Sequence, residues 1–342
     1  MSRGIVFKLT GTLSLIIILS KGYSQELQIP PVRLMFYNVE NLFDIYDDTL
    51  TEDNDFLPGG LMRWNLSRYN RKINSLYKTL IAAGEWHPPD IIALCEIENR
   101  KVLEDLLFRT NLFKFDYGIL HKDSPDERGI DVSLIYRKDI VEIVLYRYWI
   151  PSESGKDIFK TRSILYAKCL IHKDTVHLFV NHWASRRGGV LAGERLRMDI
   201  SDLVRNKVDS IAGTLPSGAK IIITGDFNCS PYDPVIKRLT NPAGSGVPLV
   251  NLSEGLSDEG LGTYRYAGTW EMIDQVIVSD CLLKSKSGLS ADGRSFRIFR
   301  TDFLLRSDPK FPGSRPFSTY LGYRYQGGFS DHLPVLLDLT VR

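Results

Sequence analysis

The feature of this sequence that most constrains its fold is a series of short apolar runs, each bordered by charged or amide residues. The runs are rich in Val, Ile, Leu and Phe, which predicts β-strands. Several are apolar throughout, as expected of strands that are buried on both faces. The expected strands span residues 32–37, 90–94, 132–136, 164–171, 176–180, 221–224, 275–279 and 335–339.

Two amphipathic helices are expected between these strands. Apolar residues recur at helical spacing over residues 66–81, and Gly84 follows them. A second apolar stripe runs over residues 196–211 and is followed by Gly213. The 342 residues are 43% hydrophobic, which is enough for one large core, so we expect a single domain with helices on the outer faces of its sheets.

The first residues have the pattern of a secretory signal peptide. Arg3 and Lys8 precede an apolar run at residues 9–19, and small residues at 22–24 fit a cleavage site. That run is about half of the ~20 residues that a membrane span needs. We therefore expect a signal peptide over residues 1–24, a mature domain over residues 25–342 with no membrane span, and export to the periplasm or the extracellular space. An uncleaved membrane anchor is the alternative interpretation.

The charge of the mature chain limits the kinds of partner it can attract. Removal of residues 1–24 takes away Arg3, Lys8 and Lys21, which changes the formal charge from +2 to −1. A chain so close to neutral has no bulk attraction for nucleic acid. Any affinity for phosphate must come from local Arg, Lys or a metal ion.

One polar strand end combines an acid with an amide. The apolar run at residues 221–224 leads through Gly225 to Asp226 and Asn228. An acid and an amide at this spacing can hold a metal-bound phosphate or its attacking water. Considered by itself, the motif could equally be an Asx-rich turn at the end of a strand.

Three further strand borders carry groups that can bind metal or move protons. His182 ends one apolar run and His332 precedes another, and a histidine held by carboxylates can act as a general base or acid. Glu96 ends a fourth run, where an ionised carboxylate is costly unless it is paired or bound to a cation. A satisfied structural histidine is the alternative at both histidine positions.

Seven short motifs together resemble the endonuclease/exonuclease/phosphatase superfamily, which includes DNase I, the sphingomyelinases and the inositol-phosphate phosphatases. They occur in the family's order across residues 33–340, although each is too short to be specific alone. The motifs are Phe36-Tyr37-Asn38-Val39-Glu40-Asn41, the strand that ends in Glu96, Arg128-Gly129-Ile130-Asp131 with Tyr136, Asn181-His182-Trp183, Gly225-Asp226-Phe227-Asn228, Ile273-Asp274-Gln275-Val276 and Ser330-Asp331-His332.

The resemblance implies an α+β fold, a DNase I-like four-layer α/β/β/α sandwich of two packed β-sheets flanked by helices, with the site at one end. It also implies a Mg²⁺ site in which Mn²⁺ can substitute. Glu96 would be the main ligand, with Asn38 and Glu40 nearby and Asp331 in the same metal shell. Asp226 and Asn228 would then position the water and the phosphoryl oxygens.

The same resemblance assigns the two histidines to different tasks. His332 would be the general base, oriented by Asp274, and His182 would face the leaving group, with Asp123 as a candidate for its orienting acid. Apurinic-site endonucleases generally lack the first histidine, so His182 moves the match toward the DNase-like, sphingomyelinase-like and phosphatase branches. No Ser or Cys has the setting of a nucleophile, which favours direct attack by water.

Candidate substrate contacts lie outside these central motifs. Arg128 and Tyr136 belong to the third motif, and Arg186 and Arg187 follow the His182 strand, where they could form a phosphate-binding loop or a solvated turn. Tyr323 lies in an aromatic run before the last motif and could stack on unpaired bases. A loop packed against the sandwich is the alternative for that run.

We therefore expect an exported, Mg²⁺-dependent phosphoesterase that hydrolyses phosphodiesters, most simply a nuclease acting on DNA or RNA. Phosphomonoester ends are usually met by several fixed cations, whereas the motifs supply one arginine, Arg128. The alternatives on the same scaffold are a phosphatase or a lipid phosphodiesterase of inositol-phosphate or sphingomyelin type. A binding module without catalysis is the alternative from another class, and no stable protein partner is implied.

Overall fold

The computed structural model describes Met1 and residues 29–85, 87–153, 157–158, 160–185, 190–215, 218–241 and 246–341. The chain divides into two units, Met1–Pro30 and Pro31–Arg342. Apart from Met1, the expected signal peptide lies outside the described residues. No helix in the described part of the chain has the length and apolar character that a membrane span requires.

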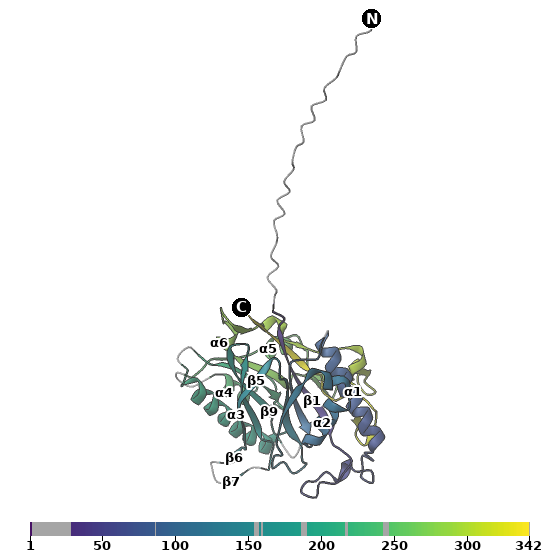
Figure 1. Cartoon of the computed structure of the whole chain (residues 1–342). Coiled ribbons are helices and arrows are strands. Elements are labelled where there is room, and N and C mark those ends of the chain that lie inside the picture. The colour runs from purple at the N-terminus through teal and green to yellow at the C-terminus, as the bar shows by residue number, and fades with distance from the viewer. Residues whose placement is uncertain are drawn as a thin grey trace. The chain divides into compact units, whose positions relative to one another are not determined.

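The second unit is built on two large β-sheets (Figure 1). The seven-stranded sheet has the order β15-β21-β1-β2-β4-β3, with β16 also paired to β21, and the six-stranded sheet has the order β11-β14-β10-β9-β8-β5. The strands of the first sheet are β1 (Val32–Leu42), β2 (Ile91–Ile97), β3 (Tyr117–His121), β4 (Asp131–Arg137), β15 (Leu289–Ala291), β16 (Arg297–Ile298) and β21 (Val335–Val341). Those of the second are β5 (Val141–Trp149), β8 (Ile164–Ile171), β9 (Asp174–His182), β10 (Lys220–Asp226), β11 (Leu249–Asn251) and β14 (Asp274–Ser279).

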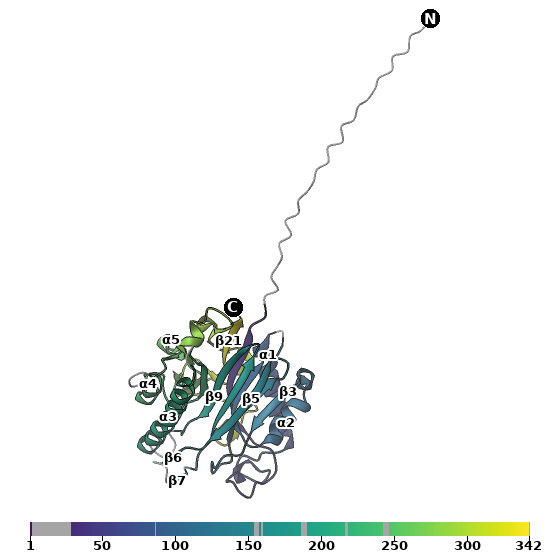
Figure 2. The same ribbon diagram turned by 60° about the vertical axis from the view of Figure 1, so that its left-hand side comes forward.

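Helices cover the outer face of each sheet (Figures 1 and 2). Helices α1 (Leu66–Gly84) and α2 (Arg100–Phe108) pack on the seven-stranded sheet, and α3 (Val190–Ala212) and α4 (Pro234–Thr240) pack on the six-stranded one. The remaining elements are short: α5 (Ser253–Asp258), α6 (Asp280–Leu283), the 3-10 helices η1 (Asn54–Phe56), η2 (Asn111–Phe115), η3 (Gly293–Ser295) and η4 (Asp302–Leu304), and the paired strands β6 (Ser152–Glu153) with β7 (Asp157–Ile158), β12 (Tyr264–Tyr266) with β13 (Thr269–Glu271), β17 (Leu305–Ser307) with β18 (Ser314–Pro316), and β19 (Tyr320–Leu321) with β20 (Arg324–Tyr325).

Alternation of side chains along the strands produces three apolar layers. On β1, Leu34 points into the core between the sheets, whereas Met35 packs against α1 and α2. On β10, Ile222 joins the same central core and Ile223 packs toward α3 and α4. The result is the four-layer sandwich, and the predicted α+β fold class is confirmed.

The eight predicted strands and both predicted helices are present, with longer boundaries in most cases. Helix α1 begins where the Asn65 side chain accepts hydrogen bonds from the Ser67 and Arg68 amides, and it ends at Gly84. Strand β3, the short strands β11, β15 and β16, and the nine-residue strand β5 were not predicted; β5 is the longest of them. It is an edge strand whose side chains are mostly exposed, so it lacks the apolar run that marked the others.

The directions of the strands explain where polar side chains collect. Strands β1 and β2 are parallel, with Asn38 opposite Cys95, and β9 and β10 are parallel, with His182 opposite Asp226. Strand β14 runs antiparallel to β10 and begins with Asp274 opposite Asp226. Because the carboxyl ends of parallel strands meet at one edge of a sheet, each sheet gathers its polar residues at a single edge.

Candidate active site

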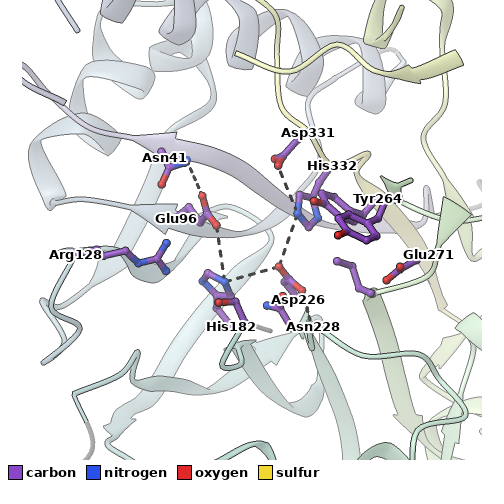
Figure 3. Close-up of a pocket in the computed structure, with 13 residues that line it drawn as sticks. Asn41, Glu96, Arg128, His182, Asp226, Asn228, Tyr264, Glu271, Asp331 and His332 are labelled. Atoms are coloured by element: carbon purple, nitrogen blue, oxygen red, sulfur yellow. Dashed lines mark hydrogen bonds and ion pairs between the residues drawn. The ribbon is translucent and has the colours of Figure 1, made fainter. Parts of the chain in front are cut away.

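A pocket of about 540 Å³ lies at the edge where these strand ends meet (Figure 3). It combines residues of both sheets with the β12–β13 hairpin and the segment before β21. Asn38 and Asp274 lie directly behind this surface, bonded to pocket residues. The lining residues are Asn41, Glu96, Arg128, His182, Ser185, Asp226, Asn228, Tyr264, Tyr266, Glu271, Ile273, Asp331 and His332.

Glu96 is presented by an irregularity in β2. Its backbone has a φ of 63°, at a point where the register with β4 shifts. Its carboxylate accepts hydrogen bonds from the Asn41 amide at 2.8 Å and from Asn38 Nδ2 at 3.3 Å. Burial opposes ionisation, but Arg128, His332 and these hydrogen bonds hold the pKa of Glu96 below its usual value. The pocket therefore contains an ionised carboxylate at this position.

Asn38 connects the two sheets. Its Nδ2 donates to Glu96 and also to Asp226 Oδ2, at 3.1 Å, and its Oδ1 accepts from the Glu40 amide at 3.0 Å. Asn38 is almost fully buried, and its bonds to Asp226 and to the Glu40 amide form away from water, whereas the bond to Glu96 is partly buried. This amide fixes the spacing between the acid at the end of β2 and the acid at the end of β10.

Asp226 lies between the two histidines. Its Oδ2 is 3.8 Å from His182 Nε2 and 3.9 Å from His332 Nε2, and its Oδ1 accepts from the Asn228 amide at 2.9 Å. Burial and the neighbouring charge of Asp274 raise the pKa of Asp226 to about 7. A carboxyl group with a pKa near neutrality can both accept and release a proton during a reaction.

The two histidines have opposite surroundings. His332 Nδ1 is 2.7 Å from Asp274 Oδ2, and although burial works in the other direction, the carboxylates around His332 raise its pKa well above the usual value. Burial and the nearby cations Arg162 and Arg128 lower the pKa of His182 well below the usual value. In the described part of the chain, no group bonds to Nδ1 of His182. His332 is thus a proton donor and His182 a neutral imidazole.

The acid suggested for orienting His182 lies elsewhere. Asp123 is 3.8 Å from His121 Nδ1, and its side chain is 87% exposed. A different acid in the same loop, Asp126, is buried and accepts from Arg162 Nη1 at 2.9 Å and from the Arg128 amide at 3.1 Å. This pair anchors the loop that carries Arg128 to the six-stranded sheet. Arg162 belongs to none of the seven motifs, so no sequence pattern pointed to it.

Glu40 is turned away from the pocket. Its carboxylate accepts hydrogen bonds from the amides of Thr319 at 2.6 Å and Tyr320 at 3.0 Å, and it lies 4.0 Å from Lys72 Nζ. Lys72, which is buried in α1, also donates to Thr319 Oγ1 at 2.5 Å and to the Phe329 carbonyl at 2.6 Å. We call this arrangement the Glu40–Lys72 latch. It holds the segment that leads into Asp331 and His332, and it places Glu40 outside the set of pocket-lining residues.

Two of the remaining predicted contacts, Tyr136 and Tyr323, are not brought to the pocket. Tyr136 packs against the core between the sheets, at the far end of β4 from Asp131. Tyr323 lies between β19 and β20, is 70% exposed and does not line the pocket. Arg186 and Arg187 lie outside the described residues. Of the predicted substrate contacts, the structure brings Arg128 to the site.

The β12–β13 hairpin supplies pocket residues that sequence reasoning missed. Tyr264 and Tyr266 come from β12 and Glu271 from β13. The ring of Tyr264 lies against His332, with centroids 4.9 Å apart and planes tilted by 36°. A signal was available, because two short aromatic runs flank Ala267-Gly268, as in a tight hairpin.

The acids of the pocket fit a divalent cation. Glu96 and Asp331 line the same pocket with like charge, and burial together with Glu96 raises the pKa of Asp331. Such repulsion between carboxylates is relieved by a hard cation, which prefers oxygen ligands. Asp226, Asp274 and His332 also have ligand atoms within 4.8 Å of one another. There, however, His332 and Asp274 already bond to each other, which suits proton transfer better than metal binding.

Comparisons with known proteins agree with this architecture. A model of the Endonuclease/Exonuclease/phosphatase family matches residues 33–341. The fold is similar to that of the human Nocturnin catalytic domain (TM-score 0.56, 18% identity, covering 92% of this chain and 97% of that one). It is also similar to a humanized D. rerio TDP2 (0.54, 14%, 91% and 99%) and to a mannosyl-6-phosphatase from Bacteroides thetaiotaomicron (0.56, 15%, 90% and 99%). A search of curated proteins gave no match to the sequence.

Proposed function

This chain belongs to the endonuclease/exonuclease/phosphatase family, and from that membership we propose that it is a Mg²⁺-dependent hydrolase of phosphodiesters. One observation carries the proposal: Asp226 lies between two histidines of opposite pKa shift, in a pocket that also contains the ionised Glu96. Groups that move protons thus face an acid that can hold a cation, as hydrolysis of a phosphate ester requires.

The residues divide the reaction between them. Glu96 and Asp331, with Asn38 behind them, would hold the cation, which when bound neutralises charge on the phosphoryl oxygens. Asp226 accepts a proton from the attacking water, as its pKa of about 7 allows. His182 donates a hydrogen bond from neutral imidazole to a phosphoryl oxygen, and Arg128 faces the same group.

His332 holds the second mobile proton. Asp274 keeps its Nδ1 occupied, so Nε2 is the atom that faces the pocket and Asp226. In the imidazolium form His332 donates its Nε2 proton to the leaving oxygen as the bond between phosphorus and that oxygen breaks, and after losing that proton it becomes the base expected from the family motif. His332 therefore exchanges a proton with the reacting groups, while Asp274 keeps the His332 ring in one orientation.

The charge of the pocket favours a small phosphodiester as the substrate. Four acids line it, namely Glu96, Asp226, Glu271 and Asp331, and Arg128 is the one arginine or lysine among the lining residues in the described part of the chain. A dianionic monoester end is usually met by several cations, and a nucleic acid strand by a row of them. A phosphomonoester of a sugar is the second candidate, because one structural neighbour is a mannosyl-6-phosphatase.

A substrate panel tests this proposal. Bis-p-nitrophenyl phosphate, p-nitrophenyl phosphate, a sugar 6-phosphate, plasmid DNA and sphingomyelin should each be assayed with Mg²⁺ and with EDTA. We expect EDTA-sensitive hydrolysis with the highest kcat/KM on a small diester. A higher kcat/KM on a monoester, or activity that survives EDTA, would contradict the proposal.

We also propose that the enzyme is exported, because residues 1–24 have the pattern of a cleaved leader. N-terminal sequencing of the protein recovered from its native compartment decides the matter. The expected first residue is Gln25, whereas a chain that keeps Met1 would contradict cleavage.

A further inference from the structure

We propose that the β12–β13 hairpin recognises the organic group esterified to the reacting phosphate, and that this group is an uncharged ring with hydrogen-bond donors on its edge. A sugar or a nucleobase has this chemistry. The inference rests on the proposed phosphoester hydrolysis and adds to it the class of the substituent. We refer to Tyr264, Tyr266 and Glu271 as the hairpin wall.

The hairpin wall occupies one side of the pocket. Figure 3 shows Tyr264 beside His332 and Glu271 on the same side, with Glu96 and Arg128 across the pocket from them. A phosphate held between Asp226 and Glu96 would therefore direct one of its substituents along the hairpin. The wall is within reach of the substrate without taking part in the proton transfers.

The hairpin is held in place before any ligand arrives. The Arg265 side chain, only 5% exposed, lies beneath it. One Nη donates to Asp308 at 2.9 Å and to the Ser314 carbonyl at 3.0 Å, and the other donates to the carbonyls of Gly268 at 3.0 Å and Pro312 at 2.6 Å. A wall fixed in this way loses little conformational entropy when it binds a ligand, which is the requirement for specific recognition.

The hairpin is also fixed relative to the catalytic groups. The Thr263 carbonyl accepts from the Leu333 amide at 2.8 Å, and the Thr263 hydroxyl accepts from the Asp274 amide at 3.3 Å. Tyr264 forms a β-bridge with His332. Three connections therefore set the distance between the wall and the His332–Asp274 pair, so the position of a bound ring is coupled to the position of the phosphate.

The residue types of the wall specify the kind of group it binds. Tyr266 is 63% exposed, so its ring offers an aromatic face on which a sugar or a base can stack. The carboxylate of Glu271 accepts hydrogen bonds from hydroxyl or N–H groups and cannot donate any. Together they favour a flat or ring-shaped group with donors at its edge.

The charge of the wall disfavours a second phosphate. Glu271 carries the wall's one formal charge, and the nearest cation among the described lining residues, Arg128, lies across the pocket. A phosphate beside Glu271 would meet a like charge. The group recognised at the hairpin is for this reason uncharged, which separates it from a neighbouring nucleotide of a strand or a polyphosphorylated inositol.

Matched substrates test the inference. Methyl p-nitrophenyl phosphate, thymidine 5′-(p-nitrophenyl phosphate) and glucose 6-(p-nitrophenyl phosphate) share the leaving group and the charge, and they differ only in the second substituent. We expect at least one ring-bearing substrate to exceed the methyl ester in kcat/KM by about tenfold or more. A preference for the glucose ester identifies a sugar as the ligand, and a preference for the thymidine ester identifies a base.

The variants Tyr266→Ala and Glu271→Gln should each lower the ratio of kcat/KM on the preferred ring-bearing ester to kcat/KM on the methyl ester by about tenfold. Tyr146→Ala and Glu142→Gln, on the exposed edge strand β5, are matched controls that should leave this ratio unchanged. Equal loss on all three esters, or no loss, would overturn the inference. So would faster hydrolysis of a thymidine ester that carries an additional 3′-phosphate.

A separate measurement keeps this test distinct from that of the proposed function. If the wild-type enzyme hydrolyses none of the diesters with Mg²⁺, the proposed diesterase activity fails. Binding of glucose 6-phosphate and thymidine 5′-monophosphate, measured by calorimetry, then decides the role of the wall. Weaker binding by about tenfold in Tyr266→Ala and Glu271→Gln supports it, provided that melting temperatures match the wild type, and unchanged binding overturns it.

Discussion

Two sides of the pocket differ in construction. One side is formed by Glu96, His182 and Asp226 at the ends of strands in the middle of the two sheets; His182 and Asp226 are buried, and the Glu96 side chain is 15% exposed. The hairpin wall comes from strands of three residues outside those sheets, and Tyr266 is largely exposed. Rigid strand ends suit groups that must keep their spacing through a reaction, whereas a loop-like rim can vary without disturbing the core. We therefore propose that the strand-end side carries out the reaction and that the hairpin wall selects the substrate.

The largest effect should come from Asp226→Asn, on the strand-end side. The amide cannot accept a proton between the two histidines, so kcat should fall by about 10³- to 10⁴-fold. Because the change affects the reaction itself, methyl and ring-bearing esters should lose activity equally. Steady-state kinetics on both esters provide the measurement, and a loss on one ester alone would break the comparison between the two sides.

Removal of either histidine of the pocket should lower kcat somewhat less than Asp226→Asn does. His182→Ala and His332→Ala should each lower kcat by about 10²- to 10³-fold, since other groups continue to stabilise the transition state. The double variant should lose less than the product of the two, because both residues act on one transition state. Near-normal turnover in His332→Ala would remove its place in proton transfer.

Substitutions in the Glu40–Lys72 latch test how much this contact, which lies outside the pocket, stabilises the fold. Lys72→Met leaves the buried Glu40 carboxylate without its cation, which should destabilise the fold by about 3 to 5 kcal/mol. The double variant Lys72→Met with Glu40→Gln should recover part of this loss, because no buried charge remains. Denaturant unfolding of the three proteins measures the effect, and equal stability of wild type and Lys72→Met would contradict the latch.

Substitution of His177 should have the smallest effect on catalysis, and it tests whether a histidine that is buried but lies outside the pocket contributes to the reaction. It lies on β9 with His182 and is also buried, but it bonds to Tyr166 at 2.9 Å and does not line the pocket. His177→Gln should leave kcat/KM within about twofold of the wild type. A large loss of kcat/KM in His177→Gln would show that the catalytic effect of a histidine on β9 does not depend on its position in the pocket.

The lowered pKa of His177 predicts that the free energy of unfolding depends on pH. Burial, with Lys168, lowers the pKa of His177 from 6.5 to about 4, so between these values the unfolded chain binds more protons than the folded one. Stability should therefore be greatest above pH 6.5 and fall as the pH drops to about 4, by up to about 3 kcal/mol from this group. Unfolding at several pH values should show a smaller acid loss in His177→Gln than in the wild type.

The sequence predicted the strand-end side because burial and polarity alternate there in a regular way. Apolar runs followed directly by Glu96, His182 or Asp226 mark the point where a strand leaves the core, and parallel strands then bring those points together. The family motifs occur at the same positions. Local pattern and global topology therefore point to the same residues.

Other features depend on contacts between distant segments and could not be read from the chain. The orientation of Glu40 is set by Lys72 and by two amides more than 270 residues away in sequence. Asp126 lies in the loop that carries Arg128 and pairs with the distant Arg162, while Nδ1 of His182 has no hydrogen-bond partner among the described residues. The hairpin wall had a local turn signal, but nothing in the sequence indicated that the hairpin would face the pocket.

The most direct test of the account is a cation titration of diester hydrolysis by the wild type and by Glu96→Gln. We expect no turnover of methyl p-nitrophenyl phosphate in EDTA, full recovery with Mg²⁺ or Mn²⁺, and a Mg²⁺ requirement raised by about tenfold or more in Glu96→Gln at an unchanged melting temperature. Full turnover in EDTA, or the same Mg²⁺ dependence in both proteins, would contradict a reaction that relies on a cation held by Glu96.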